Sequence, residues 1–276
     1  MIIKRVGGKS KISKWIKNNL PPYKVFVDVF GGSGAVLDEV VPRTNTTKRY
    51  IFNDLDSRIY TFFKVLQHRG QDLADLVQIT PYSRKFFEEA CDVIYDDEKM
   101  HLLDELDQAL IFLIVNRQSF GSRMVPPWSI AREGEIVYQT WNKLHESVME
   151  IHNKWRNVFL ENLDYKELVK KWDGKATLFY CDPPYQGVEH DYYEVNKKEG
   201  FNHQEMFDLL QGIEGSCAVS YYKDSDIVDK YVQAGYNMET KNVAMHLAKC
   251  DVKPIKTEAL LIKYNNWTKQ NKNIFE

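Results

Sequence analysis

The chain has 276 residues, of which 43% are hydrophobic and 28% are charged, as expected of one or two ordinary globular domains rather than a disordered chain. Its four cysteines lie far apart and form no CxxC pair, so neither a disulfide framework nor a zinc site is expected, and a reducing, cytoplasmic setting fits best. No run of about 18 apolar residues occurs, which argues against a transmembrane span, and the net charge of -2 does not by itself suggest a nucleic-acid partner.

The charges are distributed unevenly along the chain. Residues 1–27 carry seven cations and no acid, and residues 108–132 carry three arginines and no acid, whereas residues 88–107 carry nine acids and one lysine. Such segregation is compatible with a polyanion as partner. Solvated helix faces of different composition would give the same pattern.

The N-terminal part is predicted to alternate helices and strands. Ser10 is expected to cap a helix whose apolar residues have helical spacing, and Pro21-Pro22 ends that helix. A buried strand is then predicted for residues 24–30, a tight turn for 31–34, the start of a helix for 35–40 and a second strand for 49–53. This is the beginning of a βαβ fold.

The middle of the chain lacks strand patterns and is predicted to be helical. Apolar residues recur at helical spacing in residues 103–114, and further helices are expected near 57–67, 83–95 and 141–155. Residues 120–138 are rich in Gly, Pro and Arg and are predicted as a long loop or hairpin, which in a compact domain is usually functional.

The alternation of strands and helices returns after residue 156. Strands are expected at 157–160, 176–181 and 217–222, and helices at 202–213 and 223–233. Two final β-type runs, 236–244 and 257–264, have no helix between them and are expected to pair antiparallel. The whole is an α/β domain, residues 1–55 and 156–276, interrupted by a mainly helical insert of residues 56–155.

The segment Asp28–Gly34, DVFGGSG, is the sharpest local motif. It follows a predicted strand and begins a helix, where glycines let the backbone turn and approach a ligand closely, beside amides that point at polar atoms. Nucleotide-type cofactors are the usual ligands of such a turn, although a turn without a ligand is possible. Asp54 ends the next strand about 20 residues later, where an acid can bind both ribose hydroxyls; a helix N-cap is the alternative.

Two further motifs are Gly7-Gly8-Lys9-Ser10 and Asp182-Pro183-Pro184-Tyr185. The first is not a phosphate-binding loop, because that loop requires a glycine where Ile3 stands. The second follows a predicted buried strand, and its prolines fix the loop and leave carbonyls free to accept hydrogen bonds between an acid and an aromatic ring. This arrangement suits a flat substrate with an exocyclic amino group, such as an adenine.

Together these motifs resemble the Dam-like (D12 class, alpha group) DNA adenine-N6 methyltransferases. The resemblance spans nearly the whole chain, and the matching segments are Gly7–Lys9, Asp28–Gly34, Asn53-Asp54, Asn116–Gly121, Asp182–Tyr185 and Ser220–Tyr222. It implies a Rossmann-like S-adenosylmethionine-dependent methyltransferase sheet, with the insert as target recognition domain. Two departures are Arg5, where the family often has an aromatic residue, and the lack of an Asn between Phe120 and Gly121.

The resemblance also implies site residues. The catalytic residues would be Asp182, Pro183, Pro184 and Tyr185, without a metal. The cofactor would be S-adenosylmethionine, bound by Gly7, Gly8, Lys9, Asp28, Phe30, Gly31, Gly32, Ser33, Gly34, Asp54, Asp164 and Asp182; a helix N-terminus is the alternative role for Asp164. The target adenine would be flipped out of double-stranded DNA, which would be contacted by Lys11, Lys14, Asn116, Arg117, Arg123, Trp128 and Arg132.

Three alternative functions explain less of the sequence than a DNA adenine methyltransferase does. An RNA or N4-cytosine methyltransferase uses related tetrapeptides, but the long insert and the N-terminal Gly-Gly-Lys favour DNA adenine. A dinucleotide-binding oxidoreductase offers no role for the arginine-rich loop, and a DNA-binding module without catalysis does not explain the intact DPPY. The expected setting is the cytoplasm of a bacterium or of a phage-infected cell, with no membrane partner. The chain is expected to be a monomer, with a transient dimer on DNA as the alternative.

Overall fold

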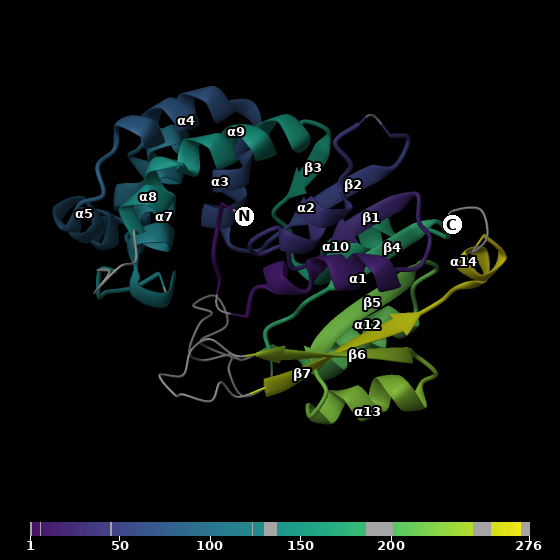
Figure 1. Ribbon diagram of the computed structural model, residues 1–276. Coiled ribbons are helices and arrows are strands. Elements are labelled where there is room, and N and C mark those ends of the chain that lie inside the picture. The colour runs from purple at the N-terminus through teal and green to yellow at the C-terminus, as the bar shows by residue number, and fades with distance from the viewer. Residues whose placement is uncertain are drawn as a thin grey trace.

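A seven-stranded mixed sheet forms the centre of the protein (Figure 1). The computed structural model describes residues 2–5, 7–44, 46–122, 124–129, 137–185, 201–244 and 255–271. In spatial order the strands are β3 (Val158–Glu161), β2 (Arg49–Asn53), β1 (Val25–Asp28), β4 (Thr177–Cys181), β5 (Ser216–Tyr222), β7 (Ile255–Lys263) and β6 (Asn237–Ala244). Neighbours from β3 to β5 are parallel, and β7 is antiparallel to both β5 and β6. The predicted α/β class and the antiparallel final pair are therefore confirmed.

Helices cover both faces of the sheet, because successive side chains of a strand point to opposite faces. Phe26 of β1 packs on the face covered by α1 (Ser13–Asn19) and α2 (Ala35–Val40), while its neighbour Val27 packs on the other face. That other face is covered by α10 (Tyr165–Trp172), α12 (His203–Gln211) and α13 (Asp226–Gln233). A short helix, α14 (Asn266–Gln270), follows β7.

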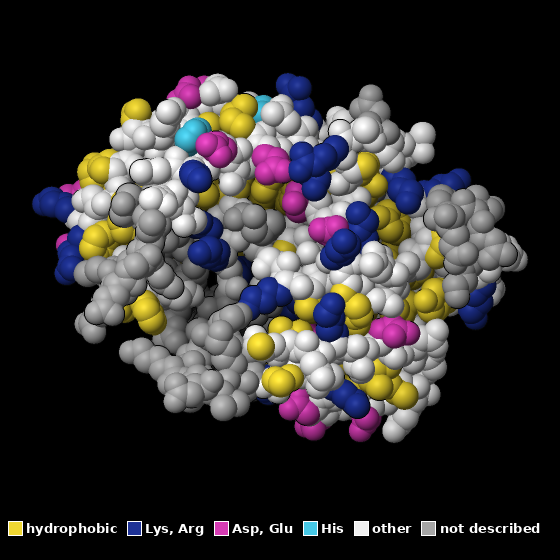
Figure 2. Space-filling view, viewed as in Figure 1, with side chains coloured by type: hydrophobic (Ala, Val, Ile, Leu, Met, Phe, Trp, Pro, Cys, Tyr) yellow, Lys and Arg dark blue, Asp and Glu magenta, His cyan; other side chains and the backbone are white. Residues whose placement is uncertain are grey.

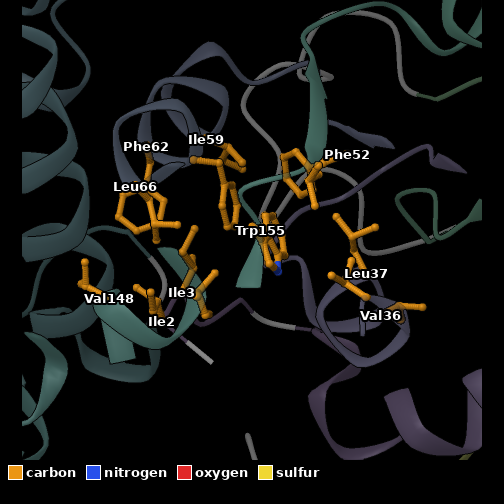
Figure 3. Packing of buried hydrophobic residues seen from close by; sticks show 14 of the residues in the cluster. Ile2, Ile3, Val36, Leu37, Phe52, Ile59, Phe62, Leu66, Val148 and Trp155 are labelled. Atoms are coloured by element: carbon orange, nitrogen blue, oxygen red, sulfur yellow. The ribbon is translucent and has the colours of Figure 1, made fainter. Parts of the chain in front are cut away.

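The helical insert lies between β2 and β3 and shares its core with one face of the sheet. Its helices are α3 (Ser57–His68), α4 (Gly70–Ile79), α5 (Arg84–Ile94), α6 (Asp97–His101), α7 (Glu105–Gln118), α8 (Val137–Asn142) and α9 (Leu144–Lys154). Figure 3 shows Trp155, at the end of the insert, close to Phe52 of β2, and both belong to one continuous apolar cluster with the insert residue Ile59. Apolar contact therefore couples the insert to the sheet, and the division into two domains stays a prediction.

The first residues of the chain pack with the insert. Ile2 and Ile3 are buried beside Leu66 and Val148 (Figure 3), and the N-terminus lies near α3 in Figure 1. The Asn116 side chain accepts a hydrogen bond from the Lys4 backbone N–H (2.9 Å) and donates one to the Lys4 carbonyl (2.8 Å). A buried amide that satisfies both backbone groups fixes this segment against α7.

Local element boundaries differ from the sequence expectations at several places. The expected Ser10 cap is wrong: residues Lys9–Lys11 form a short 3-10 helix, η1, and the N-cap of α1 is Ile12, which makes no side-chain capping bond. The segment 141–155 contains the end of α8 and all of α9, and helices α4, α6 and α14 were not expected. Helix α10 begins after Asp164, where a helix N-terminus was the alternative. Gly70 begins α4 directly after α3, so no loop composition marks that boundary.

Candidate functional site

The two principal motifs lie side by side at one edge of the sheet. Strands β1 and β4 are parallel neighbours, and the chain winds outward from them in opposite directions along the sheet. The carboxyl ends of such central strands form the crevice where α/β proteins bind ligands. The turn Asp28–Gly34 follows β1 and the segment Asp182–Tyr185 follows β4, so both open into this crevice.

The glycine turn is built from close backbone approaches. A Cβ atom on Gly31 would lie 2.2 Å from a ring carbon of Phe52, and one on Gly34 would lie 2.4 Å from the Trp155 ring. Gly34 also has a φ of 72°, in the left-handed region that favours glycine. These glycines are required by packing, and the turn they permit leaves the Gly32 N–H free to bond a side chain.

That side chain is Asp54. Its Oδ2 accepts a hydrogen bond from the Gly32 N–H (2.8 Å) and lies 3.5 Å from Arg5 Nη1, while its Oδ1 accepts from the Asp56 N–H (2.9 Å). Burial raises the pKa of Asp54, and Arg5 opposes that shift. Helix α3 is capped by Asp56, whose carboxylate accepts from the Arg58 N–H. Asp54 is therefore not the N-cap of α3 and faces the glycine turn.

Asp28 lies beneath this turn. It is 1% exposed, and among the described residues its Oδ1 has no hydrogen-bond partner. Burial, followed by the nearby carboxyls of Asp182 and Asp54, raises the pKa of Asp28 well above its usual range, and a hydrogen bond from the Leu37 backbone opposes this. Burial therefore favours the neutral form of this carboxyl.

A buried ionic cluster joins the N-terminal Gly-Gly-Lys to the segment after β4. The Lys9 ammonium lies 3.0 Å from Asp182 Oδ1 and 3.7 Å from Glu258 Oε1. Burial raises the pKa of both carboxyls and the Lys9 charge opposes that shift. Glu258, on β7, also accepts a hydrogen bond of 2.8 Å from the Tyr185 hydroxyl. Three segments distant in sequence thus meet at Lys9.

The Tyr185 ring is held on several sides. It is 6% exposed, meets the Tyr222 ring edge to face at 4.5 Å, and lies 5.9 Å from the Tyr221 ring. The Lys9 ammonium lies 4.5 Å from the centre of the Tyr185 ring, in cation–π contact. A flat ligand that stacks on this ring has to displace the ammonium or use the opposite face.

The charges of the crevice favour a cationic ligand. Asp182 and Asp54 raise the pKa of Asp28, and Asp182 raises the pKa of Glu258. The nearby cations, Lys9 and Arg5, lower the carboxyl pKa values. Raised carboxyl pKa values mean that an additional positive charge would stabilise their ionised forms. A sulfonium compound with a ribose and an adenine, such as S-adenosylmethionine, has that charge together with hydroxyls for Asp54.

Asp164 is predicted near the cofactor adenine, and Phe30 is predicted beside its methionine part. Asp164 is the N-cap of α10, and its carboxylate accepts from the Lys166 N–H at 2.9 Å, so the alternative role as a helix cap is present in the structure. Phe30 lies 5.8 Å from the Tyr165 ring and 5.5 Å from the Phe201 ring. These three rings form an aromatic cluster beside the glycine turn.

The predicted DNA-contacting residues that the structure describes differ in their exposure. Lys11 and Lys14 are exposed on η1 and α1, and Figure 2 shows Lys and Arg side chains over α1 and over the insert. Asn116 is 1% exposed and bonded to Lys4, so a direct DNA contact from Asn116 is incompatible with this conformation. Arg117 is half-buried and donates to the Ile2 carbonyl (3.3 Å). Arg123 and Arg132 lie outside the described residues.

The loop after α7 forms a narrow hairpin. Ser119 and Trp128 form an antiparallel bridge, and the Trp128 indole N–H bonds the Gln118 side chain at 3.1 Å. The Trp128 ring packs on Tyr82 at 5.2 Å, which leaves it unavailable to enter DNA in this conformation. Phe120, in the short 3-10 helix η2 (Phe120–Ser122), is 51% exposed instead.

Glu258 and Arg5 belong to the crevice, although the sequence did not identify them as site residues. Glu258 precedes an apolar run on β7, and a buried carboxylate there requires a partner. Arg5 was noted only as a departure from the family pattern. Within the described ranges, no group of three or more His, Cys, Asp or Glu side chains could hold a metal ion, and no described helix is long and apolar enough to cross a membrane.

Comparisons with known proteins agree with the resemblance inferred from the motifs. The family model for D12 class N6 adenine-specific DNA methyltransferase matches residues 6–246. DNA adenine methylase of Escherichia coli K12 is 26% identical over 192 residues, which cover 66% of this chain and 64% of that protein. The DNA N-6-adenine-methyltransferase of Escherichia phage P1 is 24% identical, over 67% of this chain and 24% of its own.

The chain thus spans less than two thirds of the length of these curated relatives. Among solved structures, precorrin-6y C5,15-methyltransferase from Geobacter metallireducens aligns with a TM-score of 0.37 and 10% identity, covering 93% of this chain and 86% of that one.

Proposed function

Because the chain belongs to the D12 class N6 adenine-specific DNA methyltransferase family, we propose that it transfers a methyl group from S-adenosylmethionine to N6 of an adenine in double-stranded DNA. The observation that carries the proposal is the meeting of Asp182 and Lys9 beside the glycine turn, at the carboxyl ends of β1 and β4. At this crevice a glycine turn suited to a cofactor lies beside Asp182, which can accept a hydrogen bond from an amino group. An oxidoreductase would require a hydride-transfer residue where DPPY stands, and we do not retain that alternative.

The acceptor residues prepare a poor nucleophile. The N6 lone pair of adenine is delocalised into the ring, so N6 needs hydrogen-bond acceptors that draw it toward a tetrahedral geometry. The Asp182 carboxylate and the Pro183 carbonyl each accept one N6 hydrogen, and Asp182, whose pKa burial raises, takes the proton that N6 loses after methylation. Positioning and matched dipoles supply most of the acceleration.

The cofactor is held across the glycine turn. The backbone of Phe30–Gly34, with Gly7, Gly8 and Lys9, would line its methionine part, and Asp54 would bind its ribose in place of the contact with Arg5. Asp164 would lie near its adenine while it caps α10. When bound, S-adenosylmethionine would supply a methyl group on a sulfonium centre, and Asp28 would support the turn from below.

The target base leaves the duplex before it reaches Asp182, at a cost of a few kcal/mol. Tyr185 stacks on the flipped adenine after Lys9 has moved from its ring. Lys11, Lys14 and Arg117, with Arg123 and Arg132 of the loop, contact phosphates or guanine edges. The exposed Phe120 is a candidate to fill the gap left by the base. The protein acts as a monomer in the cytoplasm of a bacterium or of a phage-infected cell.

Substitution of Asp182 tests the proposal. Asp182→Ala should abolish transfer of tritiated methyl groups to DNA from a methylation-free host, while calorimetry should still detect S-adenosylmethionine binding, because Asp54 and the glycine turn remain. Transfer by Asp182→Ala at the rate of the unaltered protein would contradict the assigned mechanism.

A further inference from the structure

Glu258 is a buried carboxylate that the mechanism above does not use. It is 6% exposed and lies on β7, where it pairs with Tyr222 of β5 and Lys241 of β6 across the sheet. Burial raises its pKa, and the Lys9 charge opposes the shift. A carboxylate in such a position costs free energy unless its oxygens are bonded, so its partners indicate what it does.

The shortest contact of Glu258 is with the aromatic residue of DPPY. Glu258 Oε2 accepts a hydrogen bond of 2.8 Å from the Tyr185 hydroxyl, across 73 residues of sequence. Hydrogen bonds to ionised acceptors in buried surroundings are about twice as strong as neutral ones. The bond holds the far end of the Tyr185 side chain, while the edge-to-face contact with Tyr222 limits the tilt of the ring.

We propose that Glu258 is a positioning residue for the acceptor base, acting through the Tyr185 hydroxyl. The inference rests on the proposed function, in which Tyr185 stacks on the flipped adenine. A stacked base follows the orientation of the ring beneath it, and methyl transfer is sensitive to misplacements of about 1 Å. By fixing the ring, Glu258 fixes the distance from N6 to the methyl group without touching substrate or cofactor itself.

Two substitutions of Glu258 separate its role as an acceptor from its charge. Glu258→Gln keeps an oxygen that can accept from Tyr185 and removes the charge near Lys9, whereas Glu258→Leu removes both. Each is made alone and together with Tyr185→Phe, which keeps the ring and removes the hydroxyl. The measurement is the single-turnover rate of tritiated methyl transfer to unmethylated DNA at saturating S-adenosylmethionine, with the cofactor dissociation constant measured by calorimetry.

We expect the single-turnover rate of Glu258→Gln to be within about threefold of the rate of the unaltered protein. The rate of Glu258→Leu should be about tenfold lower than that of Glu258→Gln, which corresponds to the loss of one hydrogen bond. The cofactor dissociation constants of both variants should be within about twofold of the unaltered value. In the Tyr185→Phe background the two Glu258 variants should have equal rates within about twofold. The inference would be overturned if Glu258→Gln and Glu258→Leu had nearly equal rates with Tyr185 present. It would also be overturned if the ratio of these two rates were the same with Tyr185 and with Phe at position 185.

The remaining outcomes are also decisive. If Glu258→Leu does not fold, Tyr185→Phe alone tests the inference, because it removes the same hydrogen bond by removing the donor. Its single-turnover rate should be about tenfold lower than that of the unaltered protein, and an unaltered rate would overturn the inference. Absence of transfer by the unaltered chain would contradict the proposed function, and the inference would fall with it. Transfer by the unaltered chain, with equal rates for all variants, would contradict the inference alone.

Discussion

Replacement of Lys9 by methionine should destabilise the protein in a manner that depends strongly on pH. The Lys9 ammonium is 5% exposed and lies 3.0 Å from Asp182 and 3.7 Å from Glu258, whose side chains are 20% and 8% exposed. Lys9→Met leaves both carboxylates without this cation. Breaking a buried ion pair costs about 3–5 kcal/mol, and because Asp182 retains some exposure we expect about 3 kcal/mol at pH 8.

The sign of the pH dependence follows from the two carboxyl pKa values. Burial raises both above their unfolded values and Lys9 opposes the shifts, so Lys9→Met should raise both further. A carboxyl whose pKa is higher in the folded protein favours folding fully below the unfolded pKa, and that contribution is lost as the pH rises through the folded pKa. The penalty of Lys9→Met should therefore be smaller at pH 5 than the about 3 kcal/mol expected at pH 8.

Urea unfolding followed by tryptophan fluorescence, at pH 5 and pH 8, measures this penalty. Lys11→Met is the matched control, because Lys11 is exposed in the same 3-10 helix; it should change the free energy of unfolding by less than about 0.5 kcal/mol at either pH. A Lys9→Met penalty that is equal at the two pH values, or below about 1 kcal/mol at pH 8, would refute the electrostatic reasoning.

Three other predictions concern the turn, the cofactor and DNA. Gly31→Ala places a Cβ atom 2.2 Å from Phe52 and should lower the free energy of unfolding by about 1–3 kcal/mol, whereas Gly174→Ala, with its nearest contact at 3.7 Å, should leave it unchanged; similar values for both would contradict the packing argument. Asp54→Asn should weaken S-adenosylmethionine binding about tenfold in calorimetry while the fold is kept, because it removes a charged acceptor; unchanged affinity would exclude the ribose assignment. Lys11→Gln combined with Lys14→Gln should reduce the slope of log affinity for DNA against log salt concentration by about 2, as expected for two phosphate contacts. Lys170→Gln, in a helix on the opposite face of the sheet, should leave the slope unchanged, and equal slopes in all variants would show that neither Lys11 nor Lys14 contacts DNA.

Elements defined by local signals could be predicted from the sequence. The second strand coincides with the expected residues, and α2 begins at the expected residue, directly after Gly34. The glycine turn and DPPY were recognised because each is contiguous and follows a buried strand. The predicted order of strands and helices then brought both motifs to one edge, as parallel strands require.

Long-range contacts could not be predicted in the same way. Tyr185 and Glu258 are separated by 73 residues. The hydrophobic periodicity of the sequence does not indicate which strand of a mixed sheet lies beside a given loop. Asn116 illustrates the converse: it belongs to a motif of the family, yet its amide bonds the Lys4 backbone 112 residues away and is buried. Trp128 was expected to contact DNA, and the contact of its ring with Tyr82, 46 residues earlier, could not be read from the sequence.

The central claim is methyl transfer to N6 of adenine in DNA, and it can be tested in one measurement. The chain is expressed in a host without DNA methylation, and N6-methyladenine is mapped across the host genome, with Asp182→Ala as the control. We predict N6-methyladenine at one short recurring sequence with the unaltered chain and none with the variant. A folded, soluble chain that leaves no N6-methyladenine in the host DNA would contradict the proposed function.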